Sequence, residues 1–181
     1  MTAILNSFVE SRQRFEFKSI VWLNVIKYDT SDVHKAIIKY SKNVQAVDFV
    51  AIGREASPII ALIEVKDFRQ AARGNPGHAE LVSEVCSKVV GTLGGVVSAA
   101  RGASSEFQWP VAGRRLLNAK RQLLVFLHVE LAGWNDQKDA KAELNVIRMQ
   151  LEQALAWIPE CMVNVCSQMA PGIPNFEVST I

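Results

Sequence analysis

Three residues in the first half of the chain have types and spacing suited to chemistry on a charged substrate. Asp48 is followed, after fifteen intervening residues, by the triplet Glu64-Val65-Lys66. Because side chains of a strand alternate between its two faces, Glu64 and Lys66 point the same way and Val65 points to the opposite layer. Carboxylates bind hard divalent cations, and a neighbouring ammonium stabilises developing negative charge.

The segments around these residues indicate how they come together. Residues 46–53 and 59–66 are apolar and are separated by a short polar loop. An antiparallel pairing symmetric about Ala56 places Asp48 directly opposite Glu64, with Cβ atoms about 5 Å apart. We therefore predict two carboxylates that can share one divalent cation.

A second interpretation of the same residues needs no chemistry. Charged side chains that alternate along a hairpin also form exposed salt bridges when the hairpin lies at the edge of a sheet. In that case Asp48, Glu64 and Lys66 are a solvated face of an edge hairpin.

The hydrophobic periodicity elsewhere predicts an α/β chain. Apolar spacing before the hairpin predicts a helix over 2–14, a strand over 17–26 and a short helix over 32–40. After the hairpin it predicts a helix over 76–100, a strand over 123–127, a helix from Asp136 or Asp139 to Ile158, and a strand over 162–166.

This order of elements predicts the architecture. From Ile59 onward strands alternate with helices, which is typical of parallel strands joined by right-handed crossovers. We expect a mixed central sheet with an antiparallel hairpin, parallel crossover strands and helices on both faces. The chain of 181 residues, 49% of them hydrophobic, is expected to form a single domain over 1–181.

Composition narrows the classes of function. A net charge of +2 is too small to predict a nucleic-acid binder from the overall balance, so local clusters have to be considered. Cys86, Cys161 and Cys166 lack a CxxC spacing and predict reduced, buried thiols in a cytoplasmic protein. The sequence has no run of about 18 apolar residues, which predicts no membrane association.

Several familiar sites are not predicted. His34, His78 and His128 are far apart and lack metal-ligand spacing, and His128 is expected to be a hydrogen-bonded core or edge residue. The sequence contains no GxxxxGK[ST] or GxGxxG phosphate loop and no GxSxG elbow. Nucleotide-driven motors, dinucleotide enzymes and serine hydrolases are therefore disfavoured.

The hairpin resembles the motif of the PD-(D/E)XK phosphodiesterase superfamily, which includes restriction endonucleases and Holliday-junction resolvases. The resemblance covers residues 46–69, and Val47 stands where the motif has proline. It implies a restriction-endonuclease-like fold and a Mg²⁺- or Mn²⁺-dependent nuclease, with DNA as the expected substrate and RNA as the alternative. By this resemblance Asp48, Glu64 and the Val65 carbonyl hold the metal, and Lys66 orients or activates the attacking water.

Members of this superfamily often contribute another acid from the first helix. Glu10 and Glu16 are the candidates for that role, and Glu10 is preferred because it lies within the predicted helix over 2–14. The alternative for either residue is a solvated charge on a helix face.

Basic residues in two places are candidates for nucleic-acid contacts. Arg69 and Arg73 follow the predicted catalytic strand, and the densest cluster, downstream of Trp109, consists of Arg114, Arg115, Lys120 and Arg121. Solvated surface charge is the alternative in both places. Lys88 is expected to pair with Glu84 on the surface of the long helix.

The competing function is a catalytically inactive protein of the same fold that binds a nucleic acid or a protein. Because no separate recognition module is evident, specificity is expected to come from a homodimer or from a partner protein.

Overall fold

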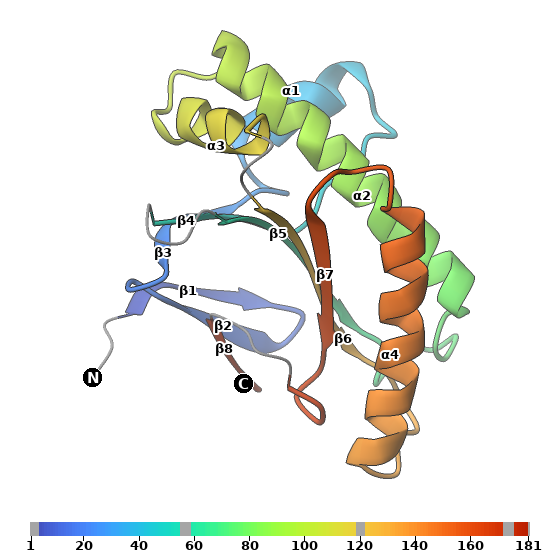
Figure 1. Cartoon of the computed structure of the whole chain (residues 1–181). Coiled ribbons are helices and arrows are strands. Elements are labelled where there is room, and N and C mark those ends of the chain that lie inside the picture. The colour runs from blue at the N-terminus through green and yellow to red at the C-terminus, as the bar shows by residue number, and fades with distance from the viewer. Residues whose placement is uncertain (1–3, 55–58, 119–121, 172–175, 181) are drawn as a thin grey trace.

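The large sheet holds the predicted hairpin in its interior. The computed structural model describes residues 4–54, 59–118, 122–171 and 176–180 (Figure 1). Its five-stranded sheet has the order β3-β4-β5-β6-β7. The strands are β3 (Trp22–Lys27), β4 (Phe49–Gly53), β5 (Ile59–Asp67), β6 (Gln122–Glu130) and β7 (Cys161–Cys166). β3, β4 and β5 are antiparallel and β5, β6 and β7 are parallel, which confirms the predicted mixed α/β sheet.

The predicted register of the hairpin is confirmed. Phe49 pairs with Ile63 and Ile52 pairs with Ile60, so the pairing of β4 with β5 is symmetric about position 56. The alternation of side chains is equally regular. Val50 and Ile60 point towards the helices, whereas Phe49 and Ile63 point to the opposite side.

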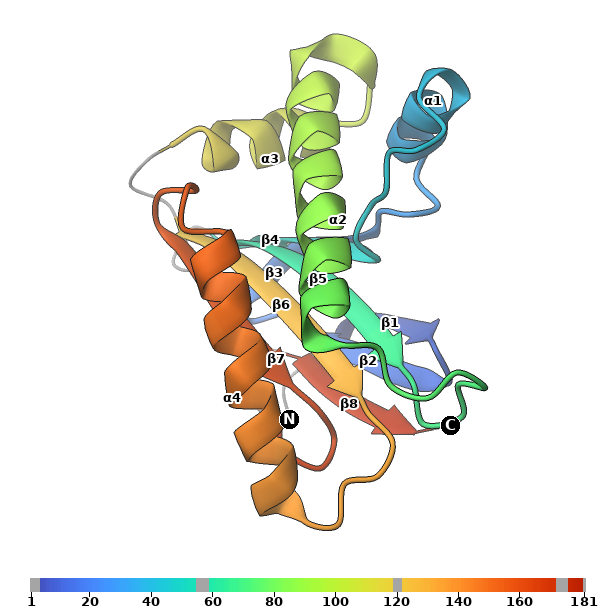
Figure 2. The same ribbon diagram turned by 90° about the vertical axis from the view of Figure 1, so that its right-hand side faces the viewer.

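The described helices cover one face of the large sheet (Figures 1 and 2). They are α1 (Asp32–Tyr40), α2 (His78–Ser98), α3 (Gln108–Leu116) and α4 (Gln137–Ala154), with a π-helical turn, η1 (Ala99–Ala103), between α2 and α3. The helices predicted over 32–40 and 76–100 are confirmed. Asp136 caps α4 by accepting hydrogen bonds from two backbone N–H groups, and α4 ends four residues before Ile158.

Helix α2 is the longest helix and lies against the middle of the sheet. The segment His78–Gly102 is long and apolar enough to cross a membrane by length and composition, a property that core helices share. Here Leu81, Val85 and Val89 pack in the core beneath α2. At Gly91 a Cβ would collide with the carbonyl oxygen of Gln45, so glycine allows the segment before β4 to lie directly on the helix.

The helix predicted over 2–14 is wrong. The described part of this range, from Ile4 onward, forms β1 (Ile4–Glu10) and the start of β2 (Gln13–Lys18), which join β8 (Phe176–Thr180) in a three-stranded sheet of order β1-β2-β8. The strand predicted over 17–26 is likewise divided between the two sheets. The two-residue turn Ser11-Arg12 has φ values of 48° and 62°, as a tight hairpin turn requires.

The prediction of helices on both faces is also wrong, because the small sheet covers the second face. Its Phe15, Phe17 and Phe176 pack against Phe49 and Phe126 of the large sheet. The ring centroids of Phe126 and Phe176 are 4.7 Å apart, and those of Phe15 and Phe49 are 5.8 Å apart. This aromatic layer stabilises a strand conformation in a segment whose apolar spacing also fits a helix.

Candidate functional site

Asp48 and Glu64 lie together on the helix face of the large sheet. Asp48 directly precedes β4, and continuing the register of the hairpin sets it opposite Glu64 on β5. Asp48 is 8% exposed and Glu64 is 1% exposed. Both strands are interior to the sheet, so these residues do not form the exposed face of an edge hairpin.

Two backbone hydrogen bonds fix the position of Asp48. The N–H of Val47 donates to the hydroxyl oxygen of Thr92 on α2 at 3.0 Å, and the N–H of Val65 donates to Asp48 Oδ2 at 2.7 Å. Burial, together with the nearby charge of Glu64, raises the pKa of Asp48 to about 7. The backbone N–H of Val65 partly opposes that shift by stabilising the carboxylate.

Glu64 is held by two lysines. Lys88 Nζ, from α2, lies 2.6 Å from Glu64 Oε1, and Lys66 Nζ lies 3.3 Å from the same oxygen. Burial nevertheless raises the pKa of Glu64, while both ammonium groups act in the opposite direction. Glu64 Oε2 is buried and has no hydrogen-bond partner in the described part of the chain.

Lys66 bridges two carboxylates. Its ammonium lies 2.5 Å from Glu84 Oε1 on α2, in addition to its contact with Glu64. Burial acts to lower the pKa of Lys66, but the bond to Glu84 and the charge of Glu64 outweigh burial and raise it. Lys66 therefore carries its positive charge at neutral pH.

The prediction that Lys88 pairs with Glu84 on the helix surface is confirmed only in part, because the contact is present but Lys88 is mostly buried and lies closer to Glu64. Lys88 is 17% exposed, and its distance to Glu84 is 3.9 Å, against 2.6 Å to Glu64. The sequence carried no sign of this contact, because Glu84 and Lys88 have the spacing of an ordinary helix-surface pair.

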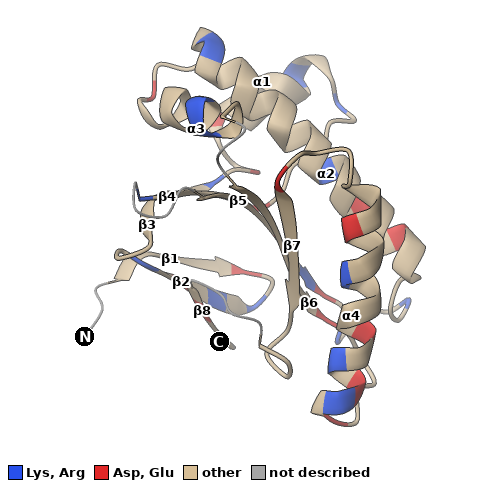
Figure 3. Cartoon of the chain, viewed as in Figure 1, with Lys and Arg blue, Asp and Glu red and all other residues tan. Residues whose placement is uncertain are grey.

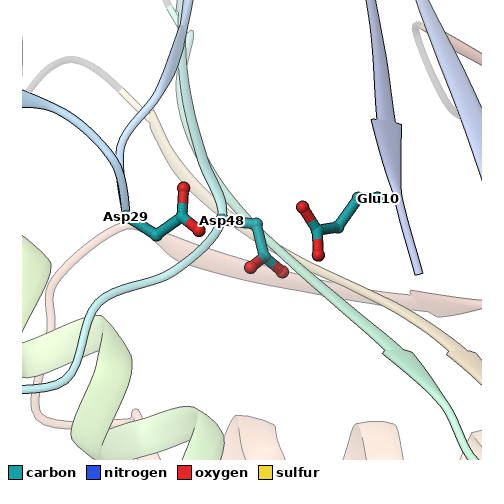
Figure 4. A group of neighbouring side chains, drawn as sticks. All are labelled: Glu10, Asp29 and Asp48. Carbon is teal, nitrogen blue, oxygen red and sulfur yellow. The ribbon is translucent and has the colours of Figure 1, made fainter.

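A group of three acids adjoins Glu64. Carboxylate oxygens of Glu10, Asp29 and Asp48 all lie within 4.8 Å of one another (Figure 4). Glu10 is the last residue of β1, so a strand positions it in this group and not the predicted helix. Lys27 Nζ contacts Glu10 Oε2 at 2.7 Å.

Asp29 was not among the sequence candidates. It follows β3, and the N–H of its neighbour Tyr28 donates to the carbonyl oxygen of Asp48 at 2.7 Å, which sets the two acids side by side. Burial raises the pKa of Asp29, and its Oδ1 has no hydrogen-bond partner among the described residues.

The acids fit a hard divalent cation. Ligand oxygens lie about 2.0–2.6 Å from Mg²⁺ or Ca²⁺, so oxygens of one coordination shell are separated by distances of the size seen here. Glu64 Oε2 and Asp29 Oδ1 have no hydrogen-bond partner among the described residues, so both oxygens are available as metal ligands. Glu16 lies in β2 between Ser7 and Glu177, outside this group.

Arg69 and Arg73 differ in their contacts within the protein. Arg69 Nη2 is 2.8 Å from Asp67 Oδ2, and Arg12 of the small sheet contacts the same oxygen at 3.1 Å. Arg73 is exposed in the turn that follows β5.

The basic cluster around α3 is not one uniform surface. Figure 3 shows basic positions in blue on α3. Arg114 is exposed, whereas Arg115 donates to the carbonyl oxygen of Gly53. Lys120 and Arg121 lie outside the described residues. Trp109 is fully buried in the core, with its indole N–H donating to Glu106, so it offers no exposed stacking surface.

The site thus combines buried carboxylates with lysines between the hairpin, α2 and the tip of β1. Comparisons of the chain with protein-family models, with curated proteins and with solved structures found no match. The function of the site has to be inferred from its own geometry.

Proposed function

We propose that this chain is a metal-dependent nuclease with a restriction-endonuclease-like fold. The observation that carries the proposal is the buried pair Asp48 and Glu64, opposite each other on adjacent antiparallel strands, with Lys66 in contact with Glu64. This arrangement matches the order Asp, Glu and Lys of the PD-(D/E)XK motif. The proposed substrate is the phosphodiester backbone of DNA, with RNA as the alternative.

Mg²⁺ or Mn²⁺ is the proposed cofactor. Asp48 would be the central ligand, because it lies between Asp29 and Glu10 (Figure 4) and opposite Glu64 in the register of the hairpin. The Val65 carbonyl remains a further proposed ligand. When bound, the cation supplies charge neutralisation of the phosphate and lowers the pKa of a bound water.

The side chains have separable tasks in this proposal. Lys66, held by Glu84, places a fixed positive charge where a hydroxide-like nucleophile and the phosphate oxygens require it. Asp48, whose pKa is about 7, is partly protonated at neutral pH and must lose that proton to act as a ligand.

Nucleic-acid contacts are proposed for the basic residues. Arg73 and Arg114 are exposed and can reach phosphates directly. Arg69 and Arg115 can do so after exchanging Asp67 and the Gly53 carbonyl for phosphate oxygens. Lys120 and Arg121 stay part of the proposal, as do a cytoplasmic location and a homodimer or protein partner that supplies specificity.

One observation favours the second candidate, an inactive protein of this fold that binds a nucleic acid or a protein. Lys88 and Lys66 both neutralise Glu64, so the carboxylate is compensated without a cation. A divalent cation would have to displace Lys88 from Glu64 Oε1.

Titration and cleavage distinguish the two candidates. The variants Asp48→Ala and Glu64→Ala should bind Mg²⁺ or Mn²⁺ much more weakly, whereas Lys66→Ala, having lost a repelling charge, should bind as well or better. All three should lose cleavage by about 100-fold or more. Glu152→Gln, an exposed acid paired with Arg148, is the matched control and should change neither property.

The nuclease proposal fails if the wild-type protein shows no metal-dependent cleavage of linear, nicked, branched or single-stranded DNA or of RNA and binds no divalent cation at millimolar concentration. The inactive binding protein is then the better description.

A further inference from the structure

A second group of reactive side chains lies on the opposite face of the large sheet. His128 on β6 and Cys166 on β7 are register partners in adjacent parallel strands. Glu130 lies two residues after His128, so it shares the same face of β6. Glu64 points to the other side of the sheet, because its strand neighbour Val65 is the partner of His128.

The three side chains form a chain of contacts. His128 Nδ1 lies 3.4 Å from Cys166 Sγ, and His128 Nε2 lies 3.1 Å from Glu130 Oε1 without the alignment of a hydrogen bond. The backbone N–H of Gln168 donates to the same Glu130 oxygen at 2.6 Å. The ring of Phe15 packs edge-on against His128, with centroids 5.5 Å apart, and so fixes the plane of the imidazole.

This order of contacts gives each group one protonation role. The Glu130 carboxylate beside Nε2 electrostatically favours the His128 tautomer with its proton on that nitrogen, and this tautomer is the one that the proposal uses. Nδ1 is then the basic nitrogen, and it faces the thiol. Cys166 therefore has a base within reach, and Glu130 stabilises the imidazolium that forms when that base takes the proton.

The thiol and its base line a cavity. A cavity of about 520 Å³ is bounded by His128, Cys166, Ser167, Phe176, Val178 and Ser179. Ser179 is exposed, so the wall of the cavity reaches the protein surface, while Phe176 and Val178 make part of it apolar. The volume is within the range of small-molecule sites.

We propose that Cys166 is a reactive thiol that reduces small hydroperoxides entering this cavity. The thiol passes its proton to His128, and the sulfur attacks the terminal, hydrogen-bearing peroxide oxygen. An S–O bond forms as the O–O bond breaks, and the leaving hydroxide or alkoxide takes the proton from the imidazolium. Sulfur loses two electrons and the peroxide gains them, so the products are a sulfenic acid and water or an alcohol.

The other two cysteines provide controls within the same chain. Burial raises the pKa of Cys86, and burial together with nearby Cys86 raises the pKa of Cys161 to about 11. Both are more exposed than Cys166, which is 2% exposed. If exposure governs reactivity, Cys86 and Cys161 are modified before Cys166. If a neighbouring base governs reactivity, Cys166 is modified first.

The test is site-resolved labelling of the folded wild-type chain at pH 7. Hydrogen peroxide or cumene hydroperoxide is added below stoichiometry, the sulfenic acid is trapped with dimedone, and each cysteine is quantified by peptide mass spectrometry. Cys166 should be labelled at least about 10-fold faster than Cys86 or Cys161. Equal labelling, or faster labelling of Cys86 or Cys161, overturns the proposal.

Variants locate the cause of the reactivity. Glu130→Gln keeps the shape of the side chain and removes its charge, and it should slow labelling of Cys166 by about 10-fold. Glu143→Gln, which alters the contact of Glu143 with His78 at 3.0 Å, is the matched control and should leave labelling unchanged. His128→Asn should abolish the preference for labelling Cys166. If neither the Glu130→Gln variant nor the His128→Asn variant changes that preference, the proposed role of His128 is refuted.

Discussion

The two faces of the large sheet differ in what they add to an apolar core. Towards α2, the charged face also buries the carboxylates of Asp48 and Glu64, with lysines beside Glu64. Towards the small sheet, the aromatic face is rich in rings and buries His128 beside Glu130. Strand β5 serves both, since Glu64 points to one face and Val65 to the other. Burying charge is costly and burying apolar surface is favourable, so the apolar packing on both faces offsets the cost of the buried charges.

The largest expected effect tests the aromatic face. Phe49 is fully buried against rings of the small sheet, so Phe49→Ala should lower the free energy of unfolding by about 3–5 kcal/mol. Urea denaturation measures the change, and Phe107→Ala, at a residue that is 74% exposed, is the control. A loss below about 1 kcal/mol would show that the aromatic layer is not what stabilises the fold.

A smaller effect is expected on the charged face. Lys88→Met removes the closer of the two ammonium groups from Glu64, and it should lower the free energy of unfolding by about 2 kcal/mol at neutral pH without divalent cations. Adding Glu64→Gln should recover much of the loss, because the unpaired charge is then gone. If the double variant is no more stable than Lys88→Met, the pair is not an energetic unit. Lys39→Met, on the exposed side of α1, is the control.

The smallest effect concerns Asp48 and pH. Its pKa rises from 3.8 to about 7 on folding, so between these values the folded state binds more protons than the unfolded state. Stability from this group is therefore present at low pH and is lost as pH rises towards 7. In EDTA, Asp48→Asn should gain stability relative to wild type by about 1 kcal/mol for each pH unit between pH 5 and pH 7. Parallel melting-temperature profiles for the two proteins would contradict this assignment.

The hairpin could be predicted from the sequence because its determinants are local. Two apolar strands joined by one short loop admit few registers, and a slip of one residue would have reversed every side chain. The same reasoning gave α1, α2 and the parallel strands. The predicted register correctly placed Asp48 beside the strand that carries Glu64.

The amino-terminal segment failed for a physical reason. Ile4, Leu5 and Phe8 fit a helical stripe, and Ser11-Arg12 lacks the asparagine or glycine that marks a two-residue turn. Contacts with residues more than a hundred positions away decide the conformation, since β2 pairs with β8.

Long-range contacts also explain the residues that sequence reasoning missed. Asp29 is beside Asp48 because β3 pairs with β4, and Lys88 contacts Glu64 because α2 packs on the helix face of the sheet, with Gly91 against the segment before β4. Cys166 meets His128 through a register between strands that only the folded sheet defines. None of these pairs has a spacing that singles it out along the chain.

The Ser11-Arg12 turn has a consequence for the time at which the acid group is assembled. Glu10 belongs to a two-stranded hairpin, and such a hairpin is marginally stable until a third strand joins it. That third strand is β8, the last of the described strands to leave a ribosome. Asp29 and Asp48 can take their places much earlier in synthesis, so the nascent chain should carry an incomplete set of acids until β8 emerges.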